Sequence, residues 1–393
     1  MVVRTLHPHL LDLARRHPVV TVTGPRQSGK TTLCRTAFPE KPYVSLEPPD
    51  EREFALRDPR AFLARCPDGA IIDELQRAPD LPSYLQPLVD ADPRAGRFIL
   101  TGSQNFSLVQ SLSQTLAGRT AIVELLPLGL EELRRFPDPP ADLHAVLWTG
   151  GYPRILDRQL PPREWLASYV ATYVERDVRQ VLNVGDLLTF QTFLRMCASR
   201  AGQLLNLSSL GAECGVTHAT ARAWLAVLEA SYIAFRLPPL HANLGKRLIK
   251  APKLYFYDTG LLCYLLGIRD APQLAVHPQR GPIFENWVIA EVLKHHRHRG
   301  LVPSLHFYRE RAGAEVDLVV ERGADRLAVE IKAAMTRRPT CSPHRTAWPA
   351  CSRRATRAGR ESPSCTRDPN PRRAAPATSC HGLTPARSPG ADD

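Results

Sequence analysis

The chain has 393 residues, of which 44% are hydrophobic, so it is long enough for two or three domains with buried cores. No apolar run is long enough to cross a membrane, and residues 1–18 lack the compact apolar core of a secretion signal, so we expect a cytoplasmic protein with no membrane partner. The nine cysteines include no C-x-x-C pair, which argues against a zinc site and against a disulfide framework.

The formal net charge of +12 is unevenly distributed along the chain. Residues 336–393 contain eleven arginines and four acidic residues, which leaves the rest of the chain only mildly basic. Charge alone is therefore weak support for a nucleic-acid partner.

Residues 24–31 read GPRQSGKT and follow an apolar, β-branched run. The pattern G-x-x-x-x-G-K-[ST] between a strand and a helix is typical of a phosphate-binding loop. Its glycines permit backbone angles that let the loop wrap phosphates with its N–H groups at the positive end of a helix. Lys30 would reach the β- and γ-phosphates, and Thr31 would offer an oxygen ligand to Mg²⁺. We therefore predict a site for ATP and Mg²⁺ formed by Gly24, Pro25, Arg26, Gln27, Ser28, Gly29, Lys30, Thr31 and Thr32.

Residues 68–74 read DGAIIDE, a turn and a short apolar strand that ends in two carboxylates. In P-loop enzymes the first carboxylate of such a pair holds Mg²⁺, and the second polarises the water that attacks the γ-phosphate. We therefore predict Asp73 as a metal ligand and Glu74 as a catalytic residue, although a strand can end in Asp-Glu by chance.

Two further regions are candidates for contact with the phosphates. The next strand is predicted at residues 97–104, and it ends in small polar residues that include Ser103 and Gln104. Ligands of parallel sheets bind at the carboxyl ends of strands, so either side chain would lie near the γ-phosphate. A plain junction between strand and turn is the alternative, more so for Gln104 than for Ser103. Arg119 precedes the next apolar strand, where a cation would stabilise phosphate charge within the subunit or across an interface. Structural pairing of Arg119 with Glu124 or a neighbouring carboxylate is the alternative that we favour.

Strands alternate with helical segments through residue 130, which predicts an α/β fold with a parallel P-loop sheet and helices on both faces in residues 1–130. Apolar residues then recur at helical spacing, so we expect residues 131–203 to form a helical lid or linker. Within it, Arg176 and Arg179 belong either to a solvated helix face or to a contact with nucleotide or a neighbour.

Residues 204–260 resemble a helix-turn-helix followed by a hairpin, as in a winged-helix module. Ser208 and Thr217 are suited to cap its two helices, and Gly215 is suited to end the first. On the second helix Arg222 is the only fixed cation, so a wing that contacts DNA phosphates and a purely architectural module both remain open. Basic residues collect after that helix, at Lys246, Arg247, Lys250 and Lys253.

Residues 261–335 supply a second set of charged side chains. A predicted helix carries Glu285, and two predicted strands, the second of which runs to Lys332, carry the other charged groups. If these strands pair, Asp317, Glu330 and Lys332 converge in a pattern that resembles the D-(x)n-E-x-K motif of metal-dependent nucleases, with Glu285 as the helix carboxylate. A solvated hairpin face is the alternative, and we expect a small α+β nuclease-like fold more than we expect cleavage itself.

Residues 336–393 contain no Ile, Val, Phe, Tyr or Lys and are rich in Arg, Pro and Ser. Such a segment cannot bury a core, so we expect it to be disordered. We hypothesise that it is an out-of-frame translation of GC-rich DNA, which would leave the nuclease-like domain truncated. Resequencing that finds an uninterrupted frame would refute this hypothesis.

Taken together, the motifs resemble a large group of prokaryotic AAA+-like P-loop ATPases whose C-terminal half is an uncharacterised, nuclease-related domain of the PD-(D/E)xK type. The resemblance covers residues 1 to about 335 and implies ATP binding and hydrolysis by Lys30, Thr31, Asp73 and Glu74. It implies no known biological role. The motifs are GPRQSGKTTL, IIDELQRAPDL, FILTGSQN, LLPLGLEEL, GGYP, ERDVRQ, LYFYDTGLLCYLLG, GPIFENWVIAE, EVDLVVE and VEIK.

We therefore expect an Mg²⁺-dependent ATPase that uses its nucleotide state to move the C-terminal half of the chain. One alternative is a nucleotide-gated module that binds or cuts DNA. Another is a signalling ATPase whose downstream domains bind only protein partners. The sequence identifies neither partner nor trigger, and it leaves open whether the chain forms oligomers.

Overall fold

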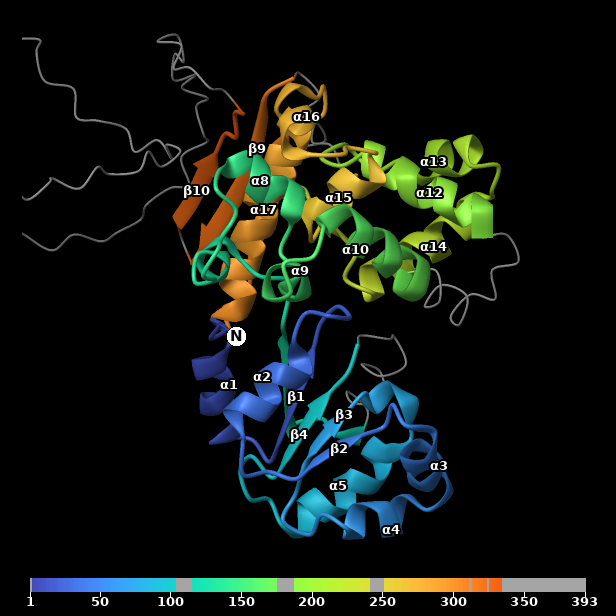
Figure 1. The fold of residues 1–393 in the computed structure, drawn as a ribbon, viewed down its shortest axis with the longest axis vertical. Helices are drawn as coiled ribbons and strands as arrows, with labels where there is room; N and C mark the ends of the chain where they lie inside the picture. The colour runs from blue at the N-terminus through green and yellow to red at the C-terminus, as the bar shows by residue number, and fades with distance from the viewer. Residues whose placement is uncertain are drawn as a thin grey trace, which may run out of the picture. The chain divides into compact units, whose positions relative to one another are not determined.

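The computed structural model describes residues 2–103, 115–174, 187–240, 251–310, 313–323 and 325–333. Its N-terminal part is an α/β domain built on a five-stranded parallel sheet of order β2-β3-β4-β1-β5, with helices on both faces (Figure 1). The elements of this domain are α1 (His7–Ala14), β1 (Val19–Thr23), α2 (Lys30–Ala37), β2 (Tyr43–Ser45), α3 (Pro49–Arg57), α4 (Pro59–Ala64), β3 (Ile71–Asp73), the 3₁₀-helix η1 (Leu75–Arg77), α5 (Leu81–Ala91), β4 (Phe98–Thr101) and β5 (Thr120–Glu124).

The two faces of this sheet bury alternate residues of its strands, as the two-residue period of a β-strand requires. Val20 and Val22 of β1 belong to a core shared with α1 and α2. Val19 of the same strand and Leu100 of β4 belong to a second core, shared with α3, α4 and α5. The predicted α/β fold, a parallel sheet covered on both faces, is confirmed.

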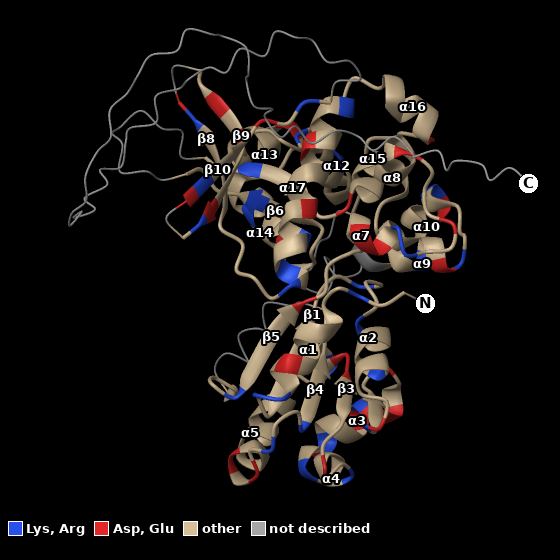
Figure 2. Ribbon diagram, turned by 90° about the vertical axis from the view of Figure 1, so that its left-hand side faces the viewer, with Lys and Arg blue, Asp and Glu red and all other residues tan. Residues whose placement is uncertain are grey.

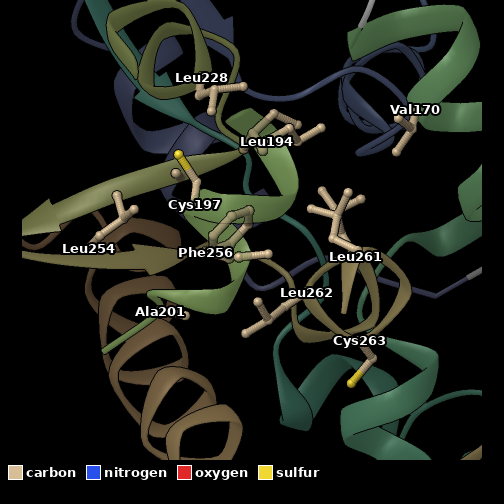
Figure 3. Close-up of a cluster of buried hydrophobic side chains, with 14 of the residues drawn as sticks. Val170, Leu194, Cys197, Ala201, Leu228, Leu254, Phe256, Leu261, Leu262 and Cys263 are labelled. Atoms are coloured by element: carbon tan, nitrogen blue, oxygen red, sulfur yellow. The ribbon is translucent and has the colours of Figure 1, made fainter. Parts of the chain in front are cut away.

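Helices follow the sheet, as the sequence predicts. They are α7 (Leu130–Leu133), α8 (Leu143–Thr149), α9 (Pro153–Asp157), α10 (Pro162–Tyr169), the π-helix η2 (Val170–Val174) and α12 (Leu187–Ser199). Most of them share one hydrophobic core with the segments that come next, so residues on both sides of the predicted domain boundary at residue 203 pack together. Figure 3 shows part of this core, including Leu194, Leu228, Phe256 and Leu261.

The helix-turn-helix consists of α13 (Leu207–Glu213) and α14 (His218–Ala230), followed by the antiparallel pair β6 (Ala234–Leu237) and β7 (Lys253–Phe256). Thr217 caps α14 through the N–H of Thr220, and Gly215 has the positive φ of 70° expected where a helix ends. The predicted cap at Ser208 is wrong, because α13 begins at Leu207 and Asn206 caps it. Six residues considered in the sequence analysis lie outside the described residues: Gln104, Arg176, Arg179, Lys246, Arg247 and Lys250.

The C-terminal part contains α15 (Thr259–Leu265), α16 (Ala271–Val276), the long helix α17 (Arg280–His298) and an antiparallel sheet of β8 (Leu305–Arg309), β9 (Glu315–Arg322) and β10 (Asp325–Val329). Charged residues of both signs lie along β9 and β10 in Figure 2. Strand β10 ends three residues before Lys332, and beyond its end the carboxylate of Asp317 accepts the N–H of Ile331 at 2.7 Å. None of the helices described here is both long and apolar enough to cross a membrane.

Candidate nucleotide site

The loop of residues 24–29 leaves the carboxyl end of β1 and enters α2. Gly24 has a φ of 144°, and a Cβ on it would come within 2.2 Å of the Leu125 carbonyl oxygen, so the backbones approach too closely for any other residue. Gly29 precedes α2 in the left-handed region, with a φ of 93°. The loop thus directs a helix N-terminus toward the carboxyl edge of the sheet, which is an arrangement suited to anions.

Lys30 is the first residue of α2 and is only 5% exposed. Its Nζ donates to two neutral groups of the loop, the carbonyl oxygens of Gly24 at 3.0 Å and Pro25 at 2.8 Å. Burial lowers the pKa of Lys30, and the carboxylates of Glu74 and Asp73 oppose that shift only in part. A buried ammonium group whose hydrogen-bond partners are uncharged is suited to an anionic ligand.

Asp73 ends β3 and collects oxygen donors from three other elements. Its Oδ2 accepts the hydroxyl of Thr31 at 2.8 Å and that of Tyr43 at 2.7 Å, and its Oδ1 accepts the hydroxyl of Thr101. Tyr43 and Thr101 come from β2 and β4, the neighbours of β3 in the sheet. The paired oxygens of Thr31 and Asp73 are of the kind that Mg²⁺ prefers. Tyr43 and Thr101 are additions to the set predicted from the sequence.

Glu74 follows Asp73 with a positive φ of 61°, in the left-handed region that non-glycine residues seldom occupy. Gln76 in η1 joins two predicted residues, because its Nε2 donates to the Glu74 carboxylate and to the Ser103 hydroxyl, the latter at 3.0 Å. Ser103 therefore lies beside Glu74 at the carboxyl edge of the sheet. The sequence analysis did not identify Gln76 as the link between them.

A cavity of about 740 Å³ opens onto this loop, within the size range of small-molecule sites. The Ser28 hydroxyl in the loop is buried, and it has no hydrogen-bond partner among the described residues. Both observations fit a loop that binds a nucleotide. Lys30, Thr31, Thr32 and Glu74 line the cavity together with groups that the sequence did not indicate, among them Arg4, Leu128, Phe136, Pro153 and Arg154.

Arg119 lies at the opposite edge of the sheet from this loop. The parallel register pairs Thr120 with Val19, so Arg119 adjoins the start of β1, whereas the loop follows its end. Its guanidinium binds the carboxylate of Asp90, with Nη2 2.9 Å from Oδ2. The predicted contact of Arg119 with phosphates of its own subunit is therefore wrong. Structural pairing is observed, but with Asp90 in place of Glu124, and a role across an interface stays a prediction.

The second predicted site is not assembled as expected. Glu285 accepts the hydroxyl of Tyr255 at 2.6 Å and lies 3.3 Å from the Nζ of Lys253. Glu330 and Lys332 form an exposed ion pair with each other, beyond the end of β10. No group of three or more His, Cys, Asp or Glu in the described part of the chain is arranged to hold a metal ion. The carboxylate of Asp317, the fourth residue of this predicted site, accepts the N–H of Ile331.

Lys253, one of the basic residues considered for a wing that contacts DNA, is buried. It is 3% exposed, and its Nζ lies 2.8 Å from Glu315 in addition to its contact with Glu285. Lys253 therefore cannot reach a DNA phosphate from this position. The sequence analysis did not identify Lys253 as an internal ion-pair partner. It also did not identify Tyr255 and Glu315 as members of this group.

The strand, loop, helix and acidic pair at one edge of a parallel sheet define a P-loop domain of the AAA type, and residues 16–134 match the family model described as an AAA domain. The chain belongs to the same family as two proteins that are named uncharacterized, Rv2008c of Mycobacterium tuberculosis and Mb2031c of Mycobacterium bovis. Each is 35% identical over 328 residues, covering 82% of this chain and 71% of the relative. Residues 140–271 and 280–350 match two domains of unknown function, DUF8612 and DUF4143.

Two solved structures are similar at a distance. The Walker-type ATPase PABY2304 of Pyrococcus abyssi is 16% identical with a TM-score of 0.45, covering 66% of this chain and 94% of that one. AMPPCP-bound DnaA from Aquifex aeolicus is 11% identical with a TM-score of 0.31, covering 57% and 86%. We draw nothing further from likenesses at these TM-scores.

Proposed function

We propose that this protein is an Mg²⁺-dependent ATPase that binds ATP at the loop of residues 24–31. One observation carries the proposal: the hydroxyl of Thr31 lies 2.8 Å from the carboxylate of Asp73, and the preceding residue, Lys30, has a buried ammonium group. A cation, a helix N-terminus and a pair of metal-type oxygens thus meet at one place, which is what a metal-bound triphosphate requires.

The residues around the loop have distinct roles in this proposal. Thr31 and Asp73 would hold Mg²⁺, which when bound neutralises charge on the phosphates. Lys30 would bind the β- and γ-phosphates, and Glu74, positioned by Gln76, would accept a proton from the attacking water. Ser103 would contact the γ-phosphate.

The walls of the cavity also support coupling between nucleotide and the rest of the chain. Lys30 and Glu74 come from the α/β domain, whereas Pro153 and Arg154 belong to α9 in the helical region. A nucleotide in this cavity would contact both regions at once. We therefore propose that the nucleotide state biases the arrangement of the helices that follow the sheet.

Binding and turnover measured on matched variants test the proposal. We expect Lys30→Ala to lower ATP affinity and reduce phosphate release by roughly 100-fold or more, because it removes the charge that binds the phosphates. We expect Glu74→Gln to keep binding ATP while turnover falls to a similar extent. Calorimetric titration and a phosphate-release assay with Mg²⁺ measure the two quantities.

Glu53→Gln on α3 is the control, because this exposed carboxylate lies outside the cavity and should leave both quantities unchanged. A wild-type chain that takes up no ATP in the titration would refute the proposal. Turnover that persists in Lys30→Ala would refute the assignment of the loop.

A further inference from the structure

Arg4 lies outside the phosphate loop but is bonded directly to it. The side chain is 7% exposed, and its Nη1 donates to the Ser28 carbonyl oxygen at 2.6 Å. Its Nη2 donates to the Leu126 carbonyl oxygen at 2.7 Å, and its Nε to the Glu132 carboxylate at 3.1 Å. One planar guanidinium therefore joins the loop, the segment that follows β5 and helix α7.

Glu132 fixes that guanidinium in place. It is 1% exposed and also accepts the N–H groups of Thr5 at 2.7 Å and Gly129 at 3.0 Å. Burial alone would raise the pKa of this carboxyl, but Arg4 and His298 outweigh burial and lower the pKa to about 2. Glu132 is therefore ionised at neutral pH and remains a full counter-charge for Arg4.

The same segment is bonded to the end of helix α17. The Nε2 of His298 accepts the N–H of Leu126 at 3.1 Å, and its Nδ1 lies 3.5 Å from the Glu132 carboxylate. Leu126 is thus held by α17 at its N–H and by Arg4 at its C=O. Burial lowers the pKa of His298 to about 4, so the ring is neutral and its Nε2 is free of a proton, as this bond requires.

Two more contacts fasten α17 to this segment at successive turns. The carboxylate of Glu291 accepts the N–H of Leu130 at 2.7 Å, and the Nζ of Lys294 donates to the Leu128 carbonyl oxygen at 3.2 Å. Glu291, Lys294 and His298 are spaced three and four residues apart, so they share one face of the helix. A shift of residues 126–132 would therefore change the hydrogen bonds along this face of α17.

We propose that Arg4 is a positioning residue that couples the phosphate loop to helix α17, an inference that rests on the proposed function. Phosphates in such a loop are bound by backbone N–H groups, and the peptide that carries the Ser28 carbonyl is one of those that move with them. The planar guanidinium of Arg4 donates both to that carbonyl and to the segment that is hydrogen-bonded to α17. Nucleotide binding and the position of α17 therefore bias each other, as any such linkage must be reciprocal.

The variant Arg4→Lys tests this role, because a lysine keeps the charge but cannot bridge three acceptors in one plane. We expect its ATP affinity to fall about tenfold and kcat to fall as well, since a displaced loop costs up to roughly 100-fold in rate. Hydrogen exchange measured with and without saturating ATP supplies the second readout. Wild-type chain should show an ATP-dependent change in exchange at residues 293–300, and Arg4→Lys should lose it even when titration shows that its site is full.

Arg16→Lys is the matched control, because Arg16 lies in the same N-terminal segment but is 65% exposed and pairs with Asp12. It should respond like the wild type. Glu132→Gln is the second variant, in case Arg4→Lys does not fold, and it should lose the same exchange response. A response that survives in a folded variant at full occupancy overturns the inference, as does a wild type that binds ATP without any response in α17. A wild type that binds no ATP overturns the proposed function as well.

Discussion

Two buried lysines, Lys30 in the phosphate loop and Lys253 beside Glu285 of the second predicted site, have opposite surroundings. Lys30 is 5% exposed, and its ammonium donates to two uncharged carbonyl groups of its own loop. Lys253 is 3% exposed, and its ammonium lies between the carboxylates of Glu285 and Glu315. Residue type and burial are thus the same at both sites, whereas the compensation of charge differs.

The pKa shifts of the two lysines follow from that difference. Burial lowers the pKa of Lys30, because Glu74 and Asp73 compensate only part of its desolvation. At Lys253 burial alone would also lower the pKa, but Glu285 and Glu315 outweigh burial and raise it. A buried lysine whose charge is only partly compensated is suited to bind an anionic ligand. A buried lysine that is paired with two carboxylates of its own chain stabilises the fold. The comparison distinguishes the proposed ligand site from a structural ion network, although each contains a buried lysine.

Removing the charge of Lys253 should have the largest effect on stability. We expect Lys253→Met to lower the free energy of unfolding by about 3 kcal/mol, at the lower end of the range for a broken buried ion pair, because Glu285 and Glu315 keep some contact with solvent. Chemical denaturation measures this loss.

Lys332→Met is the matched control, since Lys332 is 66% exposed and its pair with Glu330 should contribute less than about 1 kcal/mol. Lys30→Ala supplies the other arm of the comparison, because it should lower nucleotide affinity at a smaller cost in stability. Equal stabilities for Lys253→Met and the wild type would remove the distinction between the two sites.

Acid should affect a third buried charge cluster, which adjoins the phosphate loop. Burial lowers the pKa of His298 from 6.5 to about 4, against the opposing field of Glu132 and in the same direction as Arg4 and Lys294. Below pH 6.5 the unfolded chain protonates this histidine and the folded chain does not, so the free energy of unfolding should fall by about 3 kcal/mol as pH drops from 6.5 to 4. Glu132, with a pKa lowered from 4.5 to about 2, stabilises the fold above pH 4.5, and that contribution is lost toward pH 2.

Denaturation curves collected across this pH range measure the slope. His298→Gln keeps an acceptor for the Leu126 N–H but does not titrate, so it should flatten the slope between pH 6.5 and 4. His218→Gln, at an exposed position on α14, should leave the slope unchanged. An unaltered slope in His298→Gln would contradict the assignment.

The α/β domain was predictable because its signals are local. A strand, a glycine loop and a helix start follow one another within residues 19–33, and Asp73 with Glu74 ends one short strand. Tyr43 and Thr101 escaped prediction because they reach Asp73 from separate strands, and a single sequence does not show which strands are neighbours. The structure brings the predicted loop and acidic pair together, while their chemical roles remain proposals.

Long-range pairing explains what the sequence could not predict. Arg4 and Glu132 are 128 positions apart, and no periodic pattern connects them. The C-terminal prediction assumed that a strand continues to Lys332, and the earlier end of β10 leaves Glu330 and Lys332 paired with each other. Lys253 lies 32 positions before its partner Glu285, on a different element, so only the fold reveals the pair.

The smallest expected effect concerns Arg119, which is paired with a carboxylate as Lys253 is, but at the surface. Arg119 is 33% exposed and Asp90 is 46% exposed, so solvent screens the pair and Arg119→Ala should change stability in chemical denaturation less than any variant above. Because Arg119 lies at the sheet edge opposite the phosphate loop, turnover in dilute protein should not change. Asp90→Ala is the control and should cost the same stability. Turnover measured against protein concentration tests a role across an interface. If turnover rises with concentration in the wild type and in Asp90→Ala but not in Arg119→Ala, then Arg119 acts on the nucleotide of a neighbouring subunit. Its ion pair with Asp90 is then the arrangement of the isolated subunit.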